Sequence, residues 1–128
     1  MIVGIGADVV EVQRVARLLE RYGERFARRV LAPGEWAGYH ASLSRHVYLA
    51  SRFAVKEAFG KALGTGIRDP VLLTSIGVAH DHLGRPSLWL APDVQALSQQ
   101  RGVTAHHVTL THERSIACAM VVLEAQGT

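Results

Sequence analysis

The chain is organised around residues 52–66, which read Arg52-Phe53-Ala54-Val55-Lys56-Glu57-Ala58-Phe59-Gly60-Lys61-Ala62-Leu63-Gly64-Thr65-Gly66. With the residues before them they predict a long helix, because small apolar side chains recur at helical spacing and Gly64 follows as a left-handed stop. The side chains that share this face are Val47, Ala50, Ala54, Ala58 and Ala62. Ser44 can cap the start of the helix. Because the side chains on this face are small, a neighbouring element can pack close to it.

Both lysines of the chain, Lys56 and Lys61, lie in this stretch, whereas the other twelve of its fourteen basic residues are arginines. Lysine is a compact, mobile point charge, so its confinement to one place suggests a functional site there. Glu57 and Lys61 are four residues apart, in the order that favours an ion pair along a helix. Two interpretations are open at this point: a functional site, or an ordinary ion pair on a solvated helix face.

The length and composition limit the number of domains, the type of fold and the cellular location that the chain can have. A length of 128 residues predicts a single domain, residues 1–128, and a hydrophobic content of 48% with 20% charged residues excludes a disordered chain. The only cysteine, Cys118, excludes an internal disulfide, and the apolar run around it predicts a core position. No signal-peptide pattern or membrane-spanning stretch is found, so we expect a cytoplasmic protein without membrane association. The sequence pI of about 9.5 suggests an acidic partner.

The N-terminal segment, residues 2–10, predicts a strand in which Gly4 and Gly6 allow close approach of another backbone. This Gly-x-Gly pair lacks the third glycine of a dinucleotide-binding motif, and no parallel strand follows at the right distance, so that site is excluded. Asp8 is a carboxylate inside an apolar run. Burying it unpaired would be costly, so it needs a cation, a helix-capping role or solvent.

The remaining pattern is typical of an α+β fold with a mostly antiparallel sheet around a long central helix. Besides the first strand and the central helix, we expect a helical segment over 12–30 with a candidate break at Gly23, a short helix over 33–39, strands over 72–79 and 87–90, a helix over 92–102, and a final hairpin of strands over 106–112 and 116–123.

Five arginines recur at spacings of three and four in the segment 12–30, nearly opposite its apolar face. They are Arg14, Arg17, Arg21, Arg25 and Arg28. A docking surface for an acidic partner is at least as good an interpretation as a solvated face. The alternative function is a basic nucleic-acid-binding module without catalysis. It lacks an aromatic stacking motif and leaves the carboxylates Asp8 and Glu57 unexplained.

Two carboxylates, Asp8 and Glu57, remain as hard oxygen ligands, with Lys61 one turn beyond Glu57 and the loop Gly64-Thr65-Gly66 after it. Two carboxylates together with substrate phosphates is how magnesium is usually held. A lysine and backbone amides near the same point would neutralise charge on a transferring or departing phosphate. The histidines have no recognised zinc-ligand spacing.

Several motifs make the sequence resemble one known family. They are Gly4-Ile5-Gly6-Ala7-Asp8-Val9-Val10-Glu11-Val12 with Arg14 shortly after, Arg29-Val30-Leu31, Glu35-Trp36, Arg52-Phe53-Ala54-Val55-Lys56-Glu57-Ala58, Lys61-Ala62-Leu63-Gly64-Thr65-Gly66, Leu83-Gly84-Arg85-Pro86, and His107-Val108-Thr109-Leu110-Thr111-His112 with Ala117-Cys118-Ala119. The chain is similar along its length to the short bacterial phosphopantetheinyl transferases of the holo-acyl-carrier-protein synthase type. The resemblance therefore implies the phosphopantetheinyl transferase fold.

The resemblance also implies a reaction. Magnesium binds the pyrophosphate of coenzyme A, a serine hydroxyl of apo acyl carrier protein attacks the β-phosphorus, phosphopantetheine is transferred, and adenosine 3′,5′-bisphosphate leaves. By matching positions, Asp8 and Glu57 would hold the metal and Lys61 would bind a coenzyme A phosphate. Glu57 would accept the serine proton, directly or through a metal-bound water.

The resemblance further implies a cytoplasmic homotrimer that serves fatty acid biosynthesis, with each site at a subunit interface. Coenzyme A would then contact two chains, and Gly64, Arg45 and His112 would be contacts in addition to Lys61. The five arginines would bind acyl carrier protein, and no nucleic acid or membrane would be involved.

Overall fold

The computed structural model describes residues 1–127. Its elements, in chain order, are β1 (Ile2–Glu11), α1 (Val12–Tyr22), α2 (Glu24–Val30), the 3₁₀ turn η1 (Pro33–Glu35), α3 (Trp36–Ala41), α4 (Arg45–Leu63), the 3₁₀ turn η2 (Leu73–Ser75), β2 (Ile76–His80), β3 (Pro86–Leu90), α5 (Pro92–Gln100), β4 (Ala105–His112) and β5 (Ile116–Glu124). Within residues 1–127, no helix is both long and apolar enough to span a bilayer.

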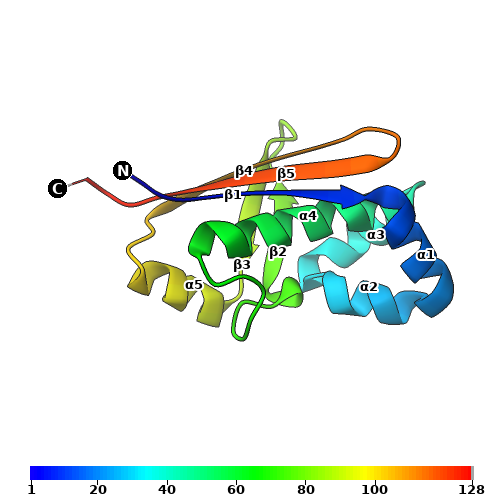
Figure 1. Ribbon diagram of the computed structural model, residues 1–128, viewed down its shortest axis with the longest axis horizontal. Coiled ribbons are helices and arrows are strands. Elements are labelled where there is room, and N and C mark those ends of the chain that lie inside the picture. The colour runs from blue at the N-terminus through cyan, green and yellow to red at the C-terminus, as the bar shows by residue number, and fades with distance from the viewer. Residues whose placement is uncertain (128) are drawn as a thin grey trace.

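The long helix α4 lies along one face of a three-stranded antiparallel sheet with the order β1-β5-β4 (Figure 1). A second antiparallel pair, β2-β3, packs beside α4, and α1 and α2 lie at the end of the molecule where β1 finishes. The face of α4 toward the sheet is fully buried at Ala50, Ala54 and Ala58. This architecture confirms the expected α+β class with a central helix.

The contact between β1 and α4 is unusually close because of two glycines. A Cβ added at Gly6 would come within 2.7 Å of the Ala62 nitrogen and closer still to the Ala58 carbonyl oxygen. A Cβ at Gly4 would likewise meet the Ala62 backbone, coming within 2.9 Å of its carbonyl carbon. The two elements therefore touch backbone to backbone, as the glycines and alanines predicted, and this contact sets the side chains of β1 directly against those of α4.

Local signals set the helix ends, with one exception. Gly64 adopts φ 89° and donates its N–H to Gly60 and Lys61 carbonyls, so it stops α4 as expected. Gly23, at φ 58°, divides the predicted segment 12–30 into α1 and α2. Ser44 occupies the N-cap position of α4, but its side chain makes no capping bond, which corrects that prediction. Its own N–H is instead bonded to Ser42 Oγ.

Two other predictions are wrong in detail. The predicted strand 72–79 begins only at Ile76, because Leu73–Ser75 form a 3₁₀ turn that brings the chain under α2. Cys118 is half-buried on the outer face of the sheet instead of in the core. Its strand neighbours Ala117 and Ala119 are the ones that face inward and are buried, and alternation along β5 turns Cys118 the other way.

Candidate active site

Residues that are some fifty positions apart in the sequence meet where β1 crosses α4. Lys61 Nζ donates hydrogen bonds to Asp8 Oδ1 at 3.0 Å and to the Ala7 carbonyl at 3.1 Å. Asp8 lies two residues beyond Gly6, on the same face of β1, and Glu57 and Asp8 line the same hollow. The structure thus brings together the three residues that the sequence singled out, because the glycine contact places this part of β1 on α4.

Two simple expectations are not met: an ion pair between Glu57 and Lys61, and a helix-capping role for Asp8. Within the described part of the chain, Lys61 forms its ion pair with Asp8 and not with Glu57. The reason is that Asp8 and the Ala7 carbonyl together offer the ammonium two acceptors. Asp8 is not a helix cap either, since α1 begins after Glu11, which occupies the N-cap position without a side-chain bond.

The two carboxylates are close enough to repel one another. Burial raises the pKa of Glu57, the Asp8 carboxylate raises it further, and Lys61 opposes the shift. A cation between such groups would relieve the repulsion. Over residues 1–127, no third histidine, cysteine or carboxylate joins them in a cluster. Two carboxylates with open positions are a donor set that suits magnesium when substrate phosphates supply further oxygens, so these residues fit that ion.

A hollow of about 490 Å³ opens beside the carboxylates, and we call it the carboxylate pocket. Its lining residues are Asp8, Val9, Val10, Glu11, Arg14, Val15, Leu18, Phe26, Phe53, Glu57 and Ile116. The lining is mostly apolar and includes the ionisable groups Asp8, Glu11, Arg14 and Glu57. Such a site combines an apolar surface for a partner with a small number of charged groups for chemistry.

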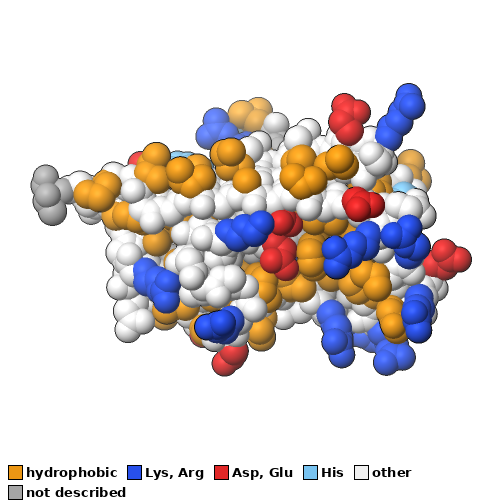
Figure 2. Space-filling model, in the orientation of Figure 1, with side chains coloured by type: hydrophobic (Ala, Val, Ile, Leu, Met, Phe, Trp, Pro, Cys, Tyr) orange, Lys and Arg blue, Asp and Glu red, His pale blue; other side chains and the backbone are white. Residues whose placement is uncertain are grey.

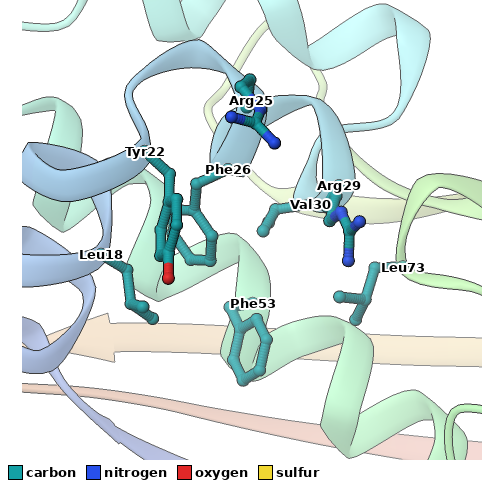
Figure 3. A pocket seen from close by; sticks show the side chains of 8 residues that line it. All are labelled: Leu18, Tyr22, Arg25, Phe26, Arg29, Val30, Phe53 and Leu73. Carbon is teal, nitrogen blue, oxygen red and sulfur yellow. The ribbon is translucent and has the colours of Figure 1, made fainter.

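A second hollow of about 490 Å³, the arginine-rimmed pocket, adjoins the first (Figure 3). It is lined by Leu18, Tyr22, Arg25, Phe26, Arg29, Val30, Phe53 and Leu73. Leu18, Phe26 and Phe53 line both pockets, so the two form one continuous surface. Figure 3 shows side chains from α1, α2, α4 and η2 turned toward a common space, with the guanidinium groups of Arg25 and Arg29 at its edge.

The five predicted arginines are all exposed, and Figure 2 shows basic side chains gathered over α1 and α2. They do not form one helical stripe, because the break at Gly23 puts Arg14, Arg17 and Arg21 on α1 but Arg25 and Arg28 on α2. Arg14 lines the carboxylate pocket and Arg25 the arginine-rimmed pocket, whereas Arg17, Arg21 and Arg28 line neither. Arg29, which the spacing argument left out, lines the arginine-rimmed pocket. Tyr22 is exposed and also lines the arginine-rimmed pocket.

The remaining expected coenzyme A contacts are spread over the chain. Gly64 follows the C-terminus of α4, on the Lys61 side, whereas Arg45 begins the same helix. At 1.5 Å per residue, the 19 residues of α4 separate its ends by about 27 Å. Arg45 there donates to the His40 carbonyl and stacks over Tyr39. His112 ends β4, paired with Ala117 next to the hairpin turn. One chain therefore does not bring Arg45 to Lys61.

Lys56 has no place in this site, which corrects the interpretation of the two lysines as one functional pair. Its side chain is fully buried and ion-paired with Glu35. Burial lowers the pKa of Lys56 to about 8, while the Glu35 carboxylate opposes that shift. Glu35 belongs to a motif of the family resemblance, but sequence reasoning assigned it no role, and no local pattern pairs it with Lys56, because the two residues are 21 positions apart.

Comparisons with known proteins identify the family and the fold. A sequence model of the 4′-phosphopantetheinyl transferase superfamily matches residues 4–121. Holo-[acyl-carrier-protein] synthase of Nitrosospira multiformis is 53% identical over 124 residues, covering 97% of this chain and 99% of the relative. The crystal structure of holo-[acyl-carrier-protein] synthase from Neisseria meningitidis superimposes with a TM-score of 0.93 at 40% identity, covering 97% of this chain and 99% of that one.

A further solved relative carries a ligand. It is a holo-(acyl-carrier-protein) synthase from Bacillus anthracis in complex with CoA (3′,5′-ADP), which has a TM-score of 0.81 and 33% identity and covers 98% of this chain and 99% of that one. These matches confirm the fold expected from the sequence and give the nucleic-acid-binding alternative no support. From the extent and identity of these matches, the chain belongs to the 4′-phosphopantetheinyl transferase superfamily.

Proposed function

We propose that the chain is a holo-acyl-carrier-protein synthase, which transfers phosphopantetheine from coenzyme A to a serine of apo acyl carrier protein and releases adenosine 3′,5′-bisphosphate. The observation that carries the proposal is the meeting of Asp8, Glu57 and Lys61 beside the carboxylate pocket. The kinship with synthases of this name, one of them in complex with CoA (3′,5′-ADP), supports the choice of substrates.

Each residue of the site has a proposed role. Asp8 and Glu57 would hold magnesium, which when bound supplies charge neutralisation for the pyrophosphate. Lys61 reaches Asp8 with a half-exposed side chain, so its ammonium can turn to a coenzyme A phosphate without a large loss of burial. The serine oxygen forms the new bond to the β-phosphorus as the bond to the departing phosphate breaks. The serine proton passes to the Glu57 carboxylate, which lines the carboxylate pocket.

The carrier would dock on the continuous surface formed by the carboxylate pocket and the arginine-rimmed pocket. Acyl carrier protein is acidic, and the surface offers exposed guanidinium groups around an apolar floor. Arg14 lies nearest the carboxylates and Arg25 at the far rim, so the charges outline a path that ends at the catalytic groups. Arg17, Arg21 and Arg28 flank this path and would steer the approach.

A homotrimer with a shared site accounts for two features of the chain. The outer face of the three-stranded sheet exposes large apolar side chains, and Ile5 and Val9 are 62% and 63% exposed. Figure 2 shows such side chains in a row along β1. A second copy would cover them, and it would also allow Arg45 and His112 of one copy to meet Lys61 and Gly64 of another. In solution, we expect a trimer by light scattering and dissociation when Ile5 is replaced by aspartate.

The physiological setting stays a prediction. Residues 1–128 would act as one transferase domain in the cytoplasm, where activation of acyl carrier protein would serve fatty acid biosynthesis. These expectations follow from the proposed substrates.

The decisive experiment mixes the protein with apo acyl carrier protein, coenzyme A and magnesium and follows the intact mass of the carrier. The expected result is a gain of one phosphopantetheine group, its loss when a chelator is added, and its return with excess magnesium. Asp8→Asn serves as the matched negative control. It keeps the shape of the side chain but removes its charge, so we expect it to give no gain in carrier mass. A carrier whose mass does not change with wild-type protein and all components present would refute the proposed function.

A further inference from the structure

The buried ammonium of Lys56 is a junction between separate parts of the fold. Lys56 Nζ donates to the Val30 carbonyl at 2.6 Å, to Glu35 Oε1 at 2.5 Å, to the Ile76 carbonyl at 2.7 Å and to the Leu73 carbonyl at 3.0 Å. These acceptors belong to α2, η1, β2 and η2, whereas the donor belongs to α4. One side chain of α4 therefore holds four segments at once, among them the C-terminal carbonyl of α2.

The Glu35 carboxylate extends the junction on its other side. Its Oε1 accepts a hydrogen bond from the Ala32 N–H at 2.8 Å, and its Oε2 accepts one from the Val78 N–H at 3.0 Å. Tyr48, also on α4, donates its hydroxyl to the Glu35 carbonyl at 2.7 Å. The connection between α2 and α3 is thus tied both to α4 and to β2 through polar groups with specific directions, which apolar packing alone would not supply.

Two of the four acceptors line the arginine-rimmed pocket. Val30 contributes the α2 wall and Leu73 the η2 wall, and the side chains of both appear in Figure 3. Phe53, which also lines the pocket, lies on α4 three residues before Lys56. Glu57, at the carboxylates, is the residue that follows Lys56. The same turn of α4 therefore fastens the pocket walls through its buried side and presents the catalytic carboxylate on its exposed side.

We propose that Lys56 and Glu35 are positioning residues that set the arginine-rimmed pocket in register with the carboxylates. The inference rests on the proposed function, because it assigns the pocket to the carrier protein and the carboxylates to the chemistry. The three protons of the ammonium serve four acceptors, so at least one proton is shared between two of them, and a shift of one wall would lengthen its bond to Nζ. A displaced wall would move the docked carrier away from Glu57 and leave coenzyme A binding at Lys61 untouched.

The test compares two variants of the junction with a structural control. Lys56→Met removes the charge at nearly constant volume, and Glu35→Gln is the milder change, which keeps one acceptor oxygen. Val94→Ala is the control, since Val94 is a fully buried residue of α5 that lines neither pocket. For each protein, the melting curve, the KM for apo carrier protein and the Kd for coenzyme A are measured well below the melting temperature.

A positioning role predicts that the variants change the KM for the carrier protein but not the Kd for coenzyme A. The carrier KM rises by roughly tenfold in Lys56→Met and roughly threefold in Glu35→Gln, because a shift on the order of 1 Å between docked groups is enough. The Kd for coenzyme A stays within about twofold of wild type, since Asp8, Glu57 and Lys61 are unchanged. Val94→Ala lowers the melting temperature but alters neither constant. Where Lys56→Met does not fold, Glu35→Gln decides.

If the variants fold and have the carrier KM of the wild type, the positioning role is overturned. Lys56 and Glu35 would then contribute only to the stability of the fold. A parallel rise of both constants, or the same rise in Val94→Ala, would overturn it equally. Wild-type turnover is recorded in the same series and tests the proposed function separately. If the wild-type protein transfers nothing, both proposals fall. If the wild type turns over normally but the variants show no difference between the carrier KM and the coenzyme A Kd, only the positioning role falls.

Discussion

Replacing Gly6 by alanine should force β1 and α4 apart and separate the two halves of the catalytic site. The added Cβ would come within 2.7 Å of the Ala62 nitrogen and 3.0 Å of the Ala58 carbonyl carbon, and closer still to the Ala58 oxygen. All three are backbone atoms, so no side-chain rotation relieves the overlap. Ordinary contact between such atoms needs about 3.5 Å, and the approach to the Ala58 oxygen means that strand and helix must move apart by roughly 1.5 Å.

The cost in stability follows from two opposing effects. Overpacking of this kind costs about 1–3 kcal/mol, and the backbone contact places Gly6→Ala at the upper end. Alanine also restricts the unfolded chain, which returns about 0.4–1 kcal/mol. The net loss is about 2 kcal/mol, and for a chain of this length it lowers the melting temperature by roughly 8 °C.

The effect on activity should be much larger than the effect on stability. Asp8 moves with β1, whereas Glu57 and Lys61 move with α4, so the displacement acts directly on the distance between them. A misplacement of about 1 Å can reduce turnover by roughly 100-fold. The measurements are a thermal melt and the rate of carrier mass gain at a temperature where the variant is fully folded.

A second glycine serves as the matched control. A Cβ at Gly34 meets no atom within 4 Å, so Gly34→Ala should retain both the melting temperature and the turnover of the wild type. If Gly6→Ala behaves like Gly34→Ala, the close contact between strand and helix does not set the geometry of the site, and the reasoning is refuted.

Further predictions concern the ionisable groups. Because burial and the Asp8 carboxylate raise the pKa of Glu57, the native state binds that proton more readily than the unfolded chain, so stability falls as pH rises through the raised pKa. The Glu57→Gln variant should therefore have a melting temperature no lower than that of the wild type at pH 7 without metal. Magnesium should stabilise only the wild type. A clear loss of stability in the metal-free variant would contradict the raised pKa. Lys61→Ala should weaken coenzyme A binding in calorimetry with a stability loss below about 1 kcal/mol, and Lys61→Arg should rescue it only in part; unchanged kinetics would reduce Lys61 to a surface ion pair. Arg14→Glu, at the carboxylate pocket, should raise the carrier KM and blunt its dependence on salt, whereas Arg85→Glu, outside both pockets, should not; equal kinetics at low salt would remove the docking role.

The elements and their order could be predicted from the sequence because local rules decide them. The alanine spacing and Gly64 predict α4, and Gly23 marks the break between α1 and α2, through interactions within one or two helix turns. Gly4 and Gly6 predict close approach of another backbone to β1, and the small residues of α4 predict close packing of a neighbouring element, but neither pattern names the other as its partner. Asp8, Glu57 and Lys61 were identified for the same reason: they are charged residues in otherwise apolar or ordered segments.

Only the tertiary structure decided which charged groups meet. Lys61 and Lys56 are both lysines of α4, five residues apart, yet one reaches Asp8 at the surface and the other is buried with Glu35. Helix position alone does not select between these outcomes, because the acceptors come from β1 for Lys61 and from η1 for Lys56. Tertiary contacts also explain why Arg29 lines the arginine-rimmed pocket and why Cys118 lies outside the core. Periodicity defines a face within an element, but the partner of that face is chosen by contacts between residues far apart in the sequence.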